Sequence, residues 1–195
     1  MDSLKKIRED LLKINDDLSK ANLVMSRGSE DAKIMFIGEA PGREEDEQGL
    51  PFVGRAGKQL SLFLKKAGIK EDDVYITNIV KYRPPNNRDP TKQEITRYAP
   101  YLKRQINIIK PDIICTLGNH STKIVLTNFV PEDIDKIKGI SQLRGKVSYV
   151  KIDGFNYKVI PVYHPAATLY NRALESVFEN DLKIVKEELK QKSLF

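Results

Sequence analysis

The feature of this sequence that most limits its fold is a series of short apolar runs, each followed by a polar or glycine-containing loop and then by a helical pattern. The runs lie at residues 33–37, 74–80 and 112–117, and residues 146–163 read as two strands around an Asp-Gly turn. Strands that are apolar throughout and separated by helices are typical of a parallel sheet covered on both faces. We therefore expect an α/β fold, a three-layer αβα sandwich with a central, mostly parallel four-stranded sheet.

Helical periodicity predicts the outer layers of this sandwich. Apolar side chains recur at helical spacing over residues 3–20, and a capping-box pattern at Thr91 and Glu94 predicts the start of a long helix. Further helices are expected at residues 60–67, 121–127 and 174–189. A chain of 195 residues has the length of one domain, so we expect residues 1–195 to form a single domain.

Composition excludes several classes of protein. One cysteine, Cys115, cannot form an internal disulfide framework or a four-cysteine metal site, and two histidines exclude the common His-rich zinc sites. No apolar run approaches the ~20 residues of a membrane span, and the N-terminal segment lacks a signal-peptide core. We therefore expect a cytoplasmic protein. The net charge of +6 suits a polyanionic partner such as nucleic acid, although Lys-rich and Glu-rich solvated surfaces are common.

Nucleotide-hydrolase and nucleophile motifs are absent. A P-loop needs Ser or Thr after Gly57-Lys58, but Gln59 follows, and Phe52 stands where the first glycine belongs. Neither GxGxxG nor GxSxG occurs in the chain. Cys115 lies within an apolar run, where we expect it to pack in the core without reacting.

Ligands of parallel sheets bind at the carboxyl ends of the strands, so the loops there hold the candidate site. Glu39 directly follows the first predicted strand, and Asn78 lies in the second. An Asn side chain offers a donor and an acceptor in one plane, which matches the edge of a pyrimidine or an amide. His164 follows the last strand, whereas His120 reads better as a residue at the start of a helix than as a site residue.

Three long motifs resemble the family 4 uracil-DNA glycosylases. They read GEAPGREEDEQGLPFVGRAG from residue 38, TNIVKYRPPNNRDPT from residue 77 and HPAA from residue 164. The resemblance spans about residues 31–170 and keeps the order of the motifs. It implies a monofunctional DNA repair enzyme that flips uracil out of DNA and hydrolyses its N-glycosidic bond, leaving an abasic site. It also implies a monomeric prokaryotic protein whose partner is uracil-containing DNA, single- or double-stranded.

The resemblance also implies roles for individual residues. Asn78 would hydrogen-bond the uracil edge, Phe52 would stack on the base, and Glu45 would block the methyl group of thymine. His164 would stabilise charge on the departing base, while Glu39 and Asn87 would position the attacking water. Gly38 and Ala40 would complete the base pocket, and the DNA-facing residues would be Pro41, Gly42, Pro165, Ala166 and Leu169.

Two features of the DNA-facing surface are less defined. Leu169 or Tyr170 would fill the space left by the flipped base, or would simply pack in the loop. Basic side chains that flank the predicted sheet edge would contact phosphates, and these are Arg55, Lys58, Lys81, Arg83, Arg88 and Arg172.

The chain departs from the family at its metal centre. Family members normally carry four cysteines that bind a 4Fe–4S cluster, whereas this chain has Tyr82 and Tyr98 at two of those positions and no cysteine in residues 11–20. We therefore expect no cofactor and no metal ligand. We expect instead a small aromatic core, in which the tyrosine hydroxyls find partners among Asn15, Asp16 and Asp17 and the N-terminal helix stays docked.

Three alternatives to a uracil-specific enzyme remain. The chain could be a noncatalytic paralogue that binds uracil or DNA, or a related glycosylase with a broader choice of bases. A covalent uracil-trapping relative is disfavoured, because its basic insertion with a reactive histidine is absent after residue 80. The presence of Glu39, Phe52, Asn78 and His164 favours the enzyme.

Overall fold

The strands pair into one six-stranded sheet in the computed structural model, which describes residues 2–192. The order across the sheet is β1-β3-β2-β4-β6-β5. Its strands are β1 (Ser26–Gly28), β2 (Ile34–Gly38), β3 (Val74–Asn78), β4 (Ile113–Leu117), β5 (Ser148–Ile152) and β6 (Phe155–Val162). Strands β3, β2, β4 and β6 run parallel at the centre, while β1 and β5 are antiparallel edge strands.

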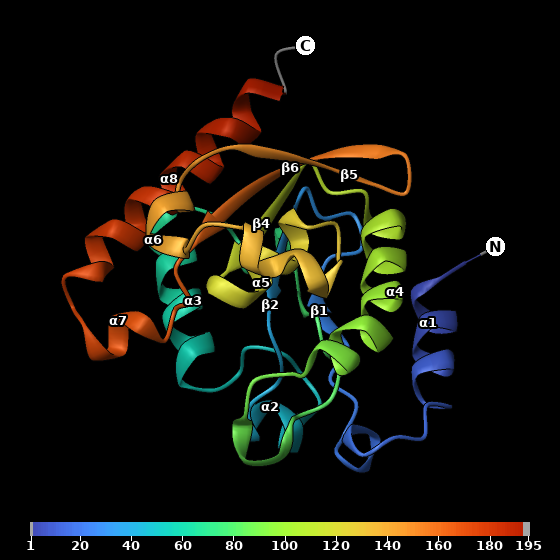
Figure 1. The fold of residues 1–195 in the computed structure, drawn as a ribbon. Helices are drawn as coiled ribbons and strands as arrows, with labels where there is room; N and C mark the ends of the chain where they lie inside the picture. Colours follow the sequence, from blue (N-terminus) through green and yellow to red (C-terminus); the bar gives the residue numbers. More distant parts are fainter. Residues whose placement is uncertain (1, 193–195) are drawn as a thin grey trace.

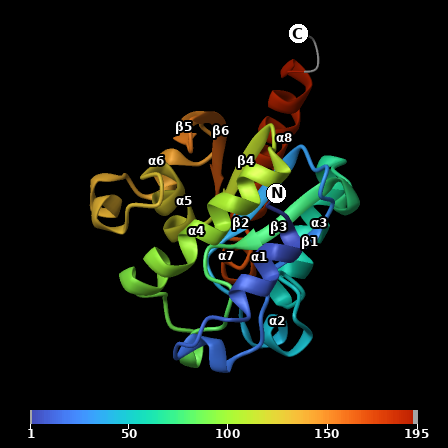
Figure 2. The ribbon, with the colours of Figure 1, turned by 90° about the vertical axis from the view of Figure 1, so that its right-hand side faces the viewer.

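Helices cover both faces of the sheet, so the expected αβα sandwich is confirmed (Figure 1). The helices are α1 (Leu4–Leu11), α2 (Arg43–Gln48), α3 (Arg55–Ala67), α4 (Lys92–Ile109), α5 (Asn119–Leu126), α6 (Ile140–Leu143), α7 (Ala167–Tyr170) and α8 (Leu174–Lys192). Helices α1 and α4 lie in front of the sheet in Figure 2, and α3 and α8 lie behind it. Successive residues of β2 show why: Met35 and Ile37 join the α1 and α4 side, whereas Ile34 and Phe36 join the α3 and α8 side.

Three expected elements differ from the structure. The sheet is wider than four strands, because the three-residue β1 is too short to give a periodic signal and β5 adds a second edge. The helix expected over residues 3–20 ends at Leu11. Further along, Asp16 Oδ1 accepts from the Ser19 N–H and the Asp16 N–H donates to Ser19 Oγ, so these residues form a local turn instead of continuing the helix. The second strand ends at Asn78 rather than at residue 80.

Within residues 2–192, no helix combines the length and the apolar character that crossing a membrane would require.

The four parallel strands bring their carboxyl ends to one edge of the sheet. Asn78 ends β3, Glu39 follows β2, His120 follows β4, and His164 follows β6. Because β3 and β4 flank β2 on opposite sides, the chain reverses its winding direction at β2, and crevices at such switch points bind ligands. The face at this edge therefore holds the candidate site.

Candidate active site

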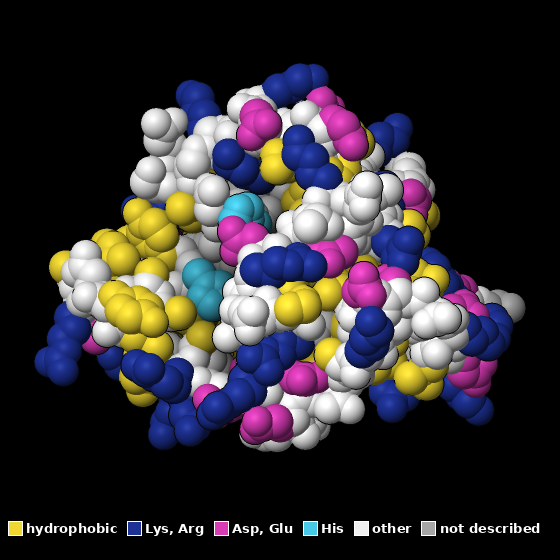
Figure 3. Space-filling model, turned by 60° about the horizontal axis from the view of Figure 1, so that its bottom comes forward, with side chains coloured by type: hydrophobic (Ala, Val, Ile, Leu, Met, Phe, Trp, Pro, Cys, Tyr) yellow, Lys and Arg dark blue, Asp and Glu magenta, His cyan; other side chains and the backbone are white. Residues whose placement is uncertain are grey.

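A cavity of about 320 Å³ opens at this edge. Its lining comes from the loops after β2 and β3, from α3 and from the segment after β6: Glu39, Ala40, Pro41, Gly42, Glu45, Phe52, Ala56, Asn78, Pro84, Asn87, Arg88, Asp89, Pro90 and His164. Figure 3 shows both histidines (cyan) beside a hollow on this face, one of them against a carboxylate (magenta). The structure thus gathers most of the site residues expected from the sequence, while Gly38, Pro165, Ala166 and Leu169 lie outside the lining.

Asn78 is the polar centre of the cavity. Among the side chains that the structure describes, its Oδ1 is the one buried side-chain atom that has no hydrogen-bond partner. A buried polar atom without a partner costs about 1–3 kcal/mol, so such an atom at a cavity wall points to a ligand. Gly38 is paired with Asn78 across β2 and β3, and a Cβ there would lie 2.3 Å from Oδ1. Only glycine leaves room for this amide.

Phe52 provides the aromatic wall. Its φ of 55° is in the left-handed region, which is uncommon for a bulky residue and concentrates at functional sites. Arg27 holds the strained turn by donating from Nε to the Pro51 carbonyl at 2.9 Å. The Phe52 ring centroid lies 5.9 Å from that of His164, with an angle of 35° between the rings. A flat heterocycle entering the cavity would meet this ring.

His164 supplies a neutral donor. Its Nδ1 accepts from the Ala166 N–H at 3.3 Å, so a neutral ring carries its proton on Nε2. Burial lowers the pKa of His164 below the usual 6.5, against the opposing charges of Glu39 and Glu45. The ring is therefore neutral at pH 7, and Nε2–H is free to donate to a ligand.

Glu45 ties the first loop together. Its Oε1 accepts from the backbone N–H groups of Val53 at 3.0 Å and Gly54 at 2.8 Å, and its Oε2 accepts from the Gly42 N–H at 3.2 Å. These bonds connect the start of α2 to the start of α3 across the Phe52 turn. Any steric role of Glu45 towards a base thus builds on a carboxylate whose orientation is already fixed.

Glu39 is bonded to a residue that sequence reasoning assigned to a helix start. Its Oε2 lies 2.8 Å from His120 Nδ1, while His120 Nε2 lies 3.9 Å from Asp89 Oδ2. His120 does lie in the first turn of α5, and it also borders the site. Ligand atoms of these three side chains lie within 4.8 Å of one another, a spacing that a metal ion can span. The 2.8 Å contact is, however, a direct hydrogen bond, so we interpret Glu39 and His120 as a hydrogen-bonded pair, with the exposed Asp89 as a nearby charge 3.9 Å from His120.

Asn87 borders the cavity from the third side. It lies in a short 3-10 turn with φ of 53°, and its Oδ1 accepts from Arg83 Nε at 2.8 Å. Its amide nitrogen is the part left to meet a ligand.

Lys81 does not contact DNA, contrary to the sequence-based expectation. Its side chain is fully buried, and its Nζ donates to Thr77 Oγ1 at 2.7 Å, to the Asn78 carbonyl at 2.5 Å and to Gln105 Oε1 at 2.6 Å. Gln105 in turn donates to the Tyr75 hydroxyl at 2.8 Å. Burial lowers the pKa of Lys81 well below its usual value. This buried network lies directly behind Asn78 and holds its backbone.

The remaining DNA-facing candidates divide by exposure. Pro165 is buried, Leu169 is half-buried, and Tyr170 is 85% exposed. Tyr170 is therefore better placed than Leu169 to reach a neighbouring molecule. Among the basic candidates, Arg88 forms a bidentate pair with Glu94, at 2.6 and 2.8 Å.

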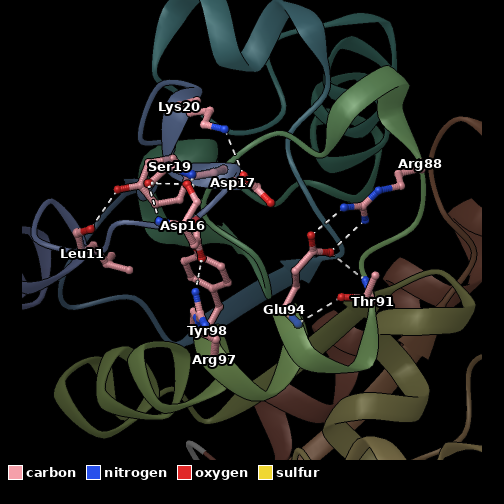
Figure 4. Close-up of polar contacts among 11 residues, drawn as sticks. Leu11, Asp16, Asp17, Ser19, Lys20, Arg88, Thr91, Glu94, Arg97 and Tyr98 are labelled. Carbon is pink, nitrogen blue, oxygen red and sulfur yellow. Dashed lines mark hydrogen bonds and ion pairs between the residues drawn. The ribbon is translucent and has the colours of Figure 1, made fainter.

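A second cluster of polar and aromatic residues, the tyrosine cluster, contains Tyr82 and Tyr98, which stand at two positions where family members carry cluster-binding cysteines (Figure 4). The rings of Tyr82 and Tyr98 pack with centroids 5.8 Å apart. Tyr82 donates to the Leu11 carbonyl at 2.9 Å, and Tyr98 donates to Asp16 Oδ2 at 3.0 Å. The predicted aromatic core is confirmed, with Leu11 in place of the polar partner expected for Tyr82. A 4Fe–4S cluster needs about four thiolates, and these side chains supply none.

The tyrosine cluster also fastens the N-terminal segment. Burial alone would raise the pKa of Asp16, but hydrogen bonds from the Ser19 N–H, the Tyr98 hydroxyl and Arg97 lower it. Burial and the Asp16 contact raise the pKa of Tyr98. Asp16 thus remains a carboxylate between its donors, and α1 stays packed on α4.

An αβα sandwich with a cavity built from an unpaired amide, an aromatic wall and a neutral imidazole is suited to binding a flat heterocyclic base. The sequence profile of the Uracil DNA glycosylase superfamily matches residues 25–187. A Type-4 uracil-DNA glycosylase of Sulfurisphaera tokodaii is 47% identical over 191 residues, which cover 96% of this chain and 85% of the relative. One of Saccharolobus solfataricus is 47% identical, over 90% of this chain and 80% of the relative. One of Archaeoglobus fulgidus is 46% identical, over 87% and 83%. The chain belongs to the uracil DNA glycosylase superfamily.

Proposed function

We propose that this protein is a monofunctional uracil-DNA glycosylase, which flips uracil out of DNA and hydrolyses its N-glycosidic bond. The observation that carries the proposal is the unpaired Oδ1 of Asn78 at the wall of the cavity. Uracil offers an N3–H donor next to its O4 acceptor, and an amide offers the complementary pair in one plane. Cytosine presents the reverse order of donor and acceptor, so the same amide would reject it. The names of the relatives support this substrate.

Cleavage of the bond between C1′ and N1 leaves its electrons on uracil and an oxocarbenium-like sugar. Nε2–H of His164 would donate to O2 of the departing anion, and donors in a dry pocket stabilise developing charge most effectively. Phe52 would stack on the base, a contact worth about 1–3 kcal/mol. Water would add to C1′, oriented by Glu39 and the amide of Asn87, and its proton would pass to the uracil anion or to solvent. An abasic site remains in the DNA.

The expected substrate is uracil-containing DNA, in single or double strands, bound by a monomer. Pro41 and Gly42 at the cavity rim, and the backbone of Pro165 and Ala166, would face phosphates. Leu169 and the exposed Tyr170 would fill the stack after the base is flipped. The reaction would need neither a metal ion nor an iron–sulfur cluster, because each step above uses side chains of the chain itself. We expect such an enzyme in the cytoplasm of a prokaryotic cell.

The test is incubation of the pure protein with a labelled single-uracil oligonucleotide in EDTA, followed by alkali to cleave abasic sites. The proposal predicts strand cleavage at uracil only, with strong loss in N78A, whose fold should be intact because the amide makes no internal hydrogen bond through Oδ1. A folded protein that binds uracil-containing DNA without releasing uracil would contradict the proposed activity and favour a noncatalytic binding protein.

A further inference from the structure

We propose that His120 is a positioning residue of this glycosylase: held between Glu39 and Asp89, its ring fixes the Glu39 carboxylate for the attacking water. The inference rests on the proposed function and extends it to a residue on a different strand loop.

The geometry begins at the end of β4. Gly118 turns the chain with φ of 98°, and α5 starts at the next residue, so His120 projects from its first turn. Strand β4 is the direct neighbour of β2, whose following residue is Glu39. A Cβ on Gly118 would lie 3.1 Å from His164 Cβ, so the same turn packs against the other histidine. The two imidazoles therefore border the site from adjacent strands.

The contact with His120 gives the two carboxylate oxygens of Glu39 different roles. Oε2 is 2.8 Å from His120 Nδ1, a normal charge-assisted distance, which leaves Oε1 to accept from a water molecule. A glutamate has several rotatable bonds, and anchoring one oxygen selects the rotamers in which the other faces the cavity. His120 itself does not line the cavity and need not touch DNA or base.

The charged groups that face His120 come from three elements. Glu39 approaches from the loop after β2, Asp89 from the loop after β3, and Lys123 lies one turn along α5. The hydrogen bond to Glu39 raises the pKa of His120 above 6.5, burial opposes the rise, the charges of Glu39 and Asp89 add to it, and Lys123 opposes it. The imidazolium pair is thus complete below pH 6.5 and is lost as pH rises through the raised pKa. His164 shifts in the opposite direction.

The two histidines would then set the two limbs of the pH profile. His164 must be neutral to donate from Nε2 only, and His120 must be protonated to hold Glu39 as an ion pair. The pKa of His164 is lowered below 6.5 and that of His120 is raised above it, so neutral His164 and protonated His120 coexist at pH values between the two. Activity is expected to fall on the acid side through His164 and on the alkaline side through His120.

The first measurement is an NMR titration in EDTA, and it needs no activity. The chain has two histidines, so only two ring signals titrate. We expect the His120 signal to titrate above 6.5 and to move down in E39Q, with a smaller change in D89N because that contact is 3.9 Å. An unchanged pKa of the His120 signal in E39Q would contradict the proposed pairing of His120 with Glu39.

The second measurement is single-turnover uracil release as a function of pH, together with KM. H120A should lower kcat roughly 10- to 100-fold, as expected for a lost hydrogen bond to a charged group, with KM unchanged. H120N keeps a neutral donor near the Nδ1 position but not the charge, so its rate should match that of the wild type above the alkaline limb and should not change with pH in that range. An active wild type whose rate and pH profile are unchanged in H120A overturns this role alone. An inactive wild type overturns the proposed function, and this role with it.

Discussion

The connection between β3 and α4 contributes Asn87 to the cavity and Tyr82 to the tyrosine cluster, yet the two regions are built in opposite ways. At the cavity, Asn78 leaves a buried oxygen without a partner, and Phe52 is held in a strained conformation. In the tyrosine cluster, Tyr82 and Tyr98 are buried, their rings are in contact, and both hydroxyls have acceptors. The cavity therefore keeps a hydrogen-bonding atom available for a ligand, whereas both hydroxyls of the tyrosine cluster are hydrogen-bonded within the fold.

The largest expected effect is on stability, at the tyrosine cluster. Replacing Tyr98 with Ala removes a fully buried ring and should cost about 3–5 kcal/mol of unfolding free energy. Y98F keeps the ring and should cost less, about 1.5–3 kcal/mol, for the bond to the charged carboxylate of Asp16. Chemical denaturation measures both, and uracil release at a permissive temperature should stay near that of the wild type. Loss of activity in folded Y98F would mean that the two regions are not separate.

The next effect lies where the two regions meet. Replacing Lys81 with Met leaves acceptors at Thr77, Asn78 and Gln105 without their donor, which should cost about 1–3 kcal/mol of stability or more. Because one acceptor is the Asn78 carbonyl, uracil release should also fall, through kcat. Denaturation and single-turnover kinetics of K81M test this. A variant as stable and active as the wild type would mean that the buried network does not support Asn78.

The acid side of the pH profile tests the neutral imidazole at the cavity. Since burial lowers the pKa of His164, uracil release should stay high below pH 6.5 and then fall about tenfold per pH unit once that pKa is passed. The sign follows because protonation removes the neutral form, and the stability of the fold should decline in the same direction. H164Q, which cannot titrate, should be slower and lack this limb. An acid limb that persists in H164Q would assign it to another group.

The smallest expected effect is electrostatic. Binding to DNA should weaken linearly in log salt, and R172Q should reduce the slope by about 0.9 if Arg172 contacts one phosphate. Lys81 offers the contrast: K81M should leave the slope unchanged, because its side chain is buried. Fluorescence anisotropy at several salt concentrations measures both slopes. An affinity that does not depend on salt would exclude the expected phosphate contacts.

Three cavity residues, Glu39, Asn78 and His164, were predictable because they lie at the ends of strands that the sequence marks clearly. Glu45, Phe52 and Asn87 came from the family resemblance instead. The inward direction of the Lys81 side chain could not be predicted, because a basic residue in a loop is usually solvated. Nothing in the local sequence pattern indicates that Thr77, Asn78 and Gln105 accept hydrogen bonds from it. The contact between His120 and Glu39 was also missed, because it depends on the pairing of β2 with β4 rather than on spacing. That residues 1–195 form a single domain stays a prediction.

The most direct test concerns the amide that reads the base. Single-turnover rates should be measured for wild type and N78D on oligonucleotides that carry one uracil or one unpaired cytosine at the same position. The unpaired Oδ1 of Asn78 predicts that the wild type releases uracil and leaves cytosine. In N78D, an acceptor replaces the amide donor, so uracil release should fall by about 10- to 100-fold and the preference over cytosine should narrow or invert. Unchanged uracil kinetics and unchanged discrimination in N78D would show that another residue reads the base.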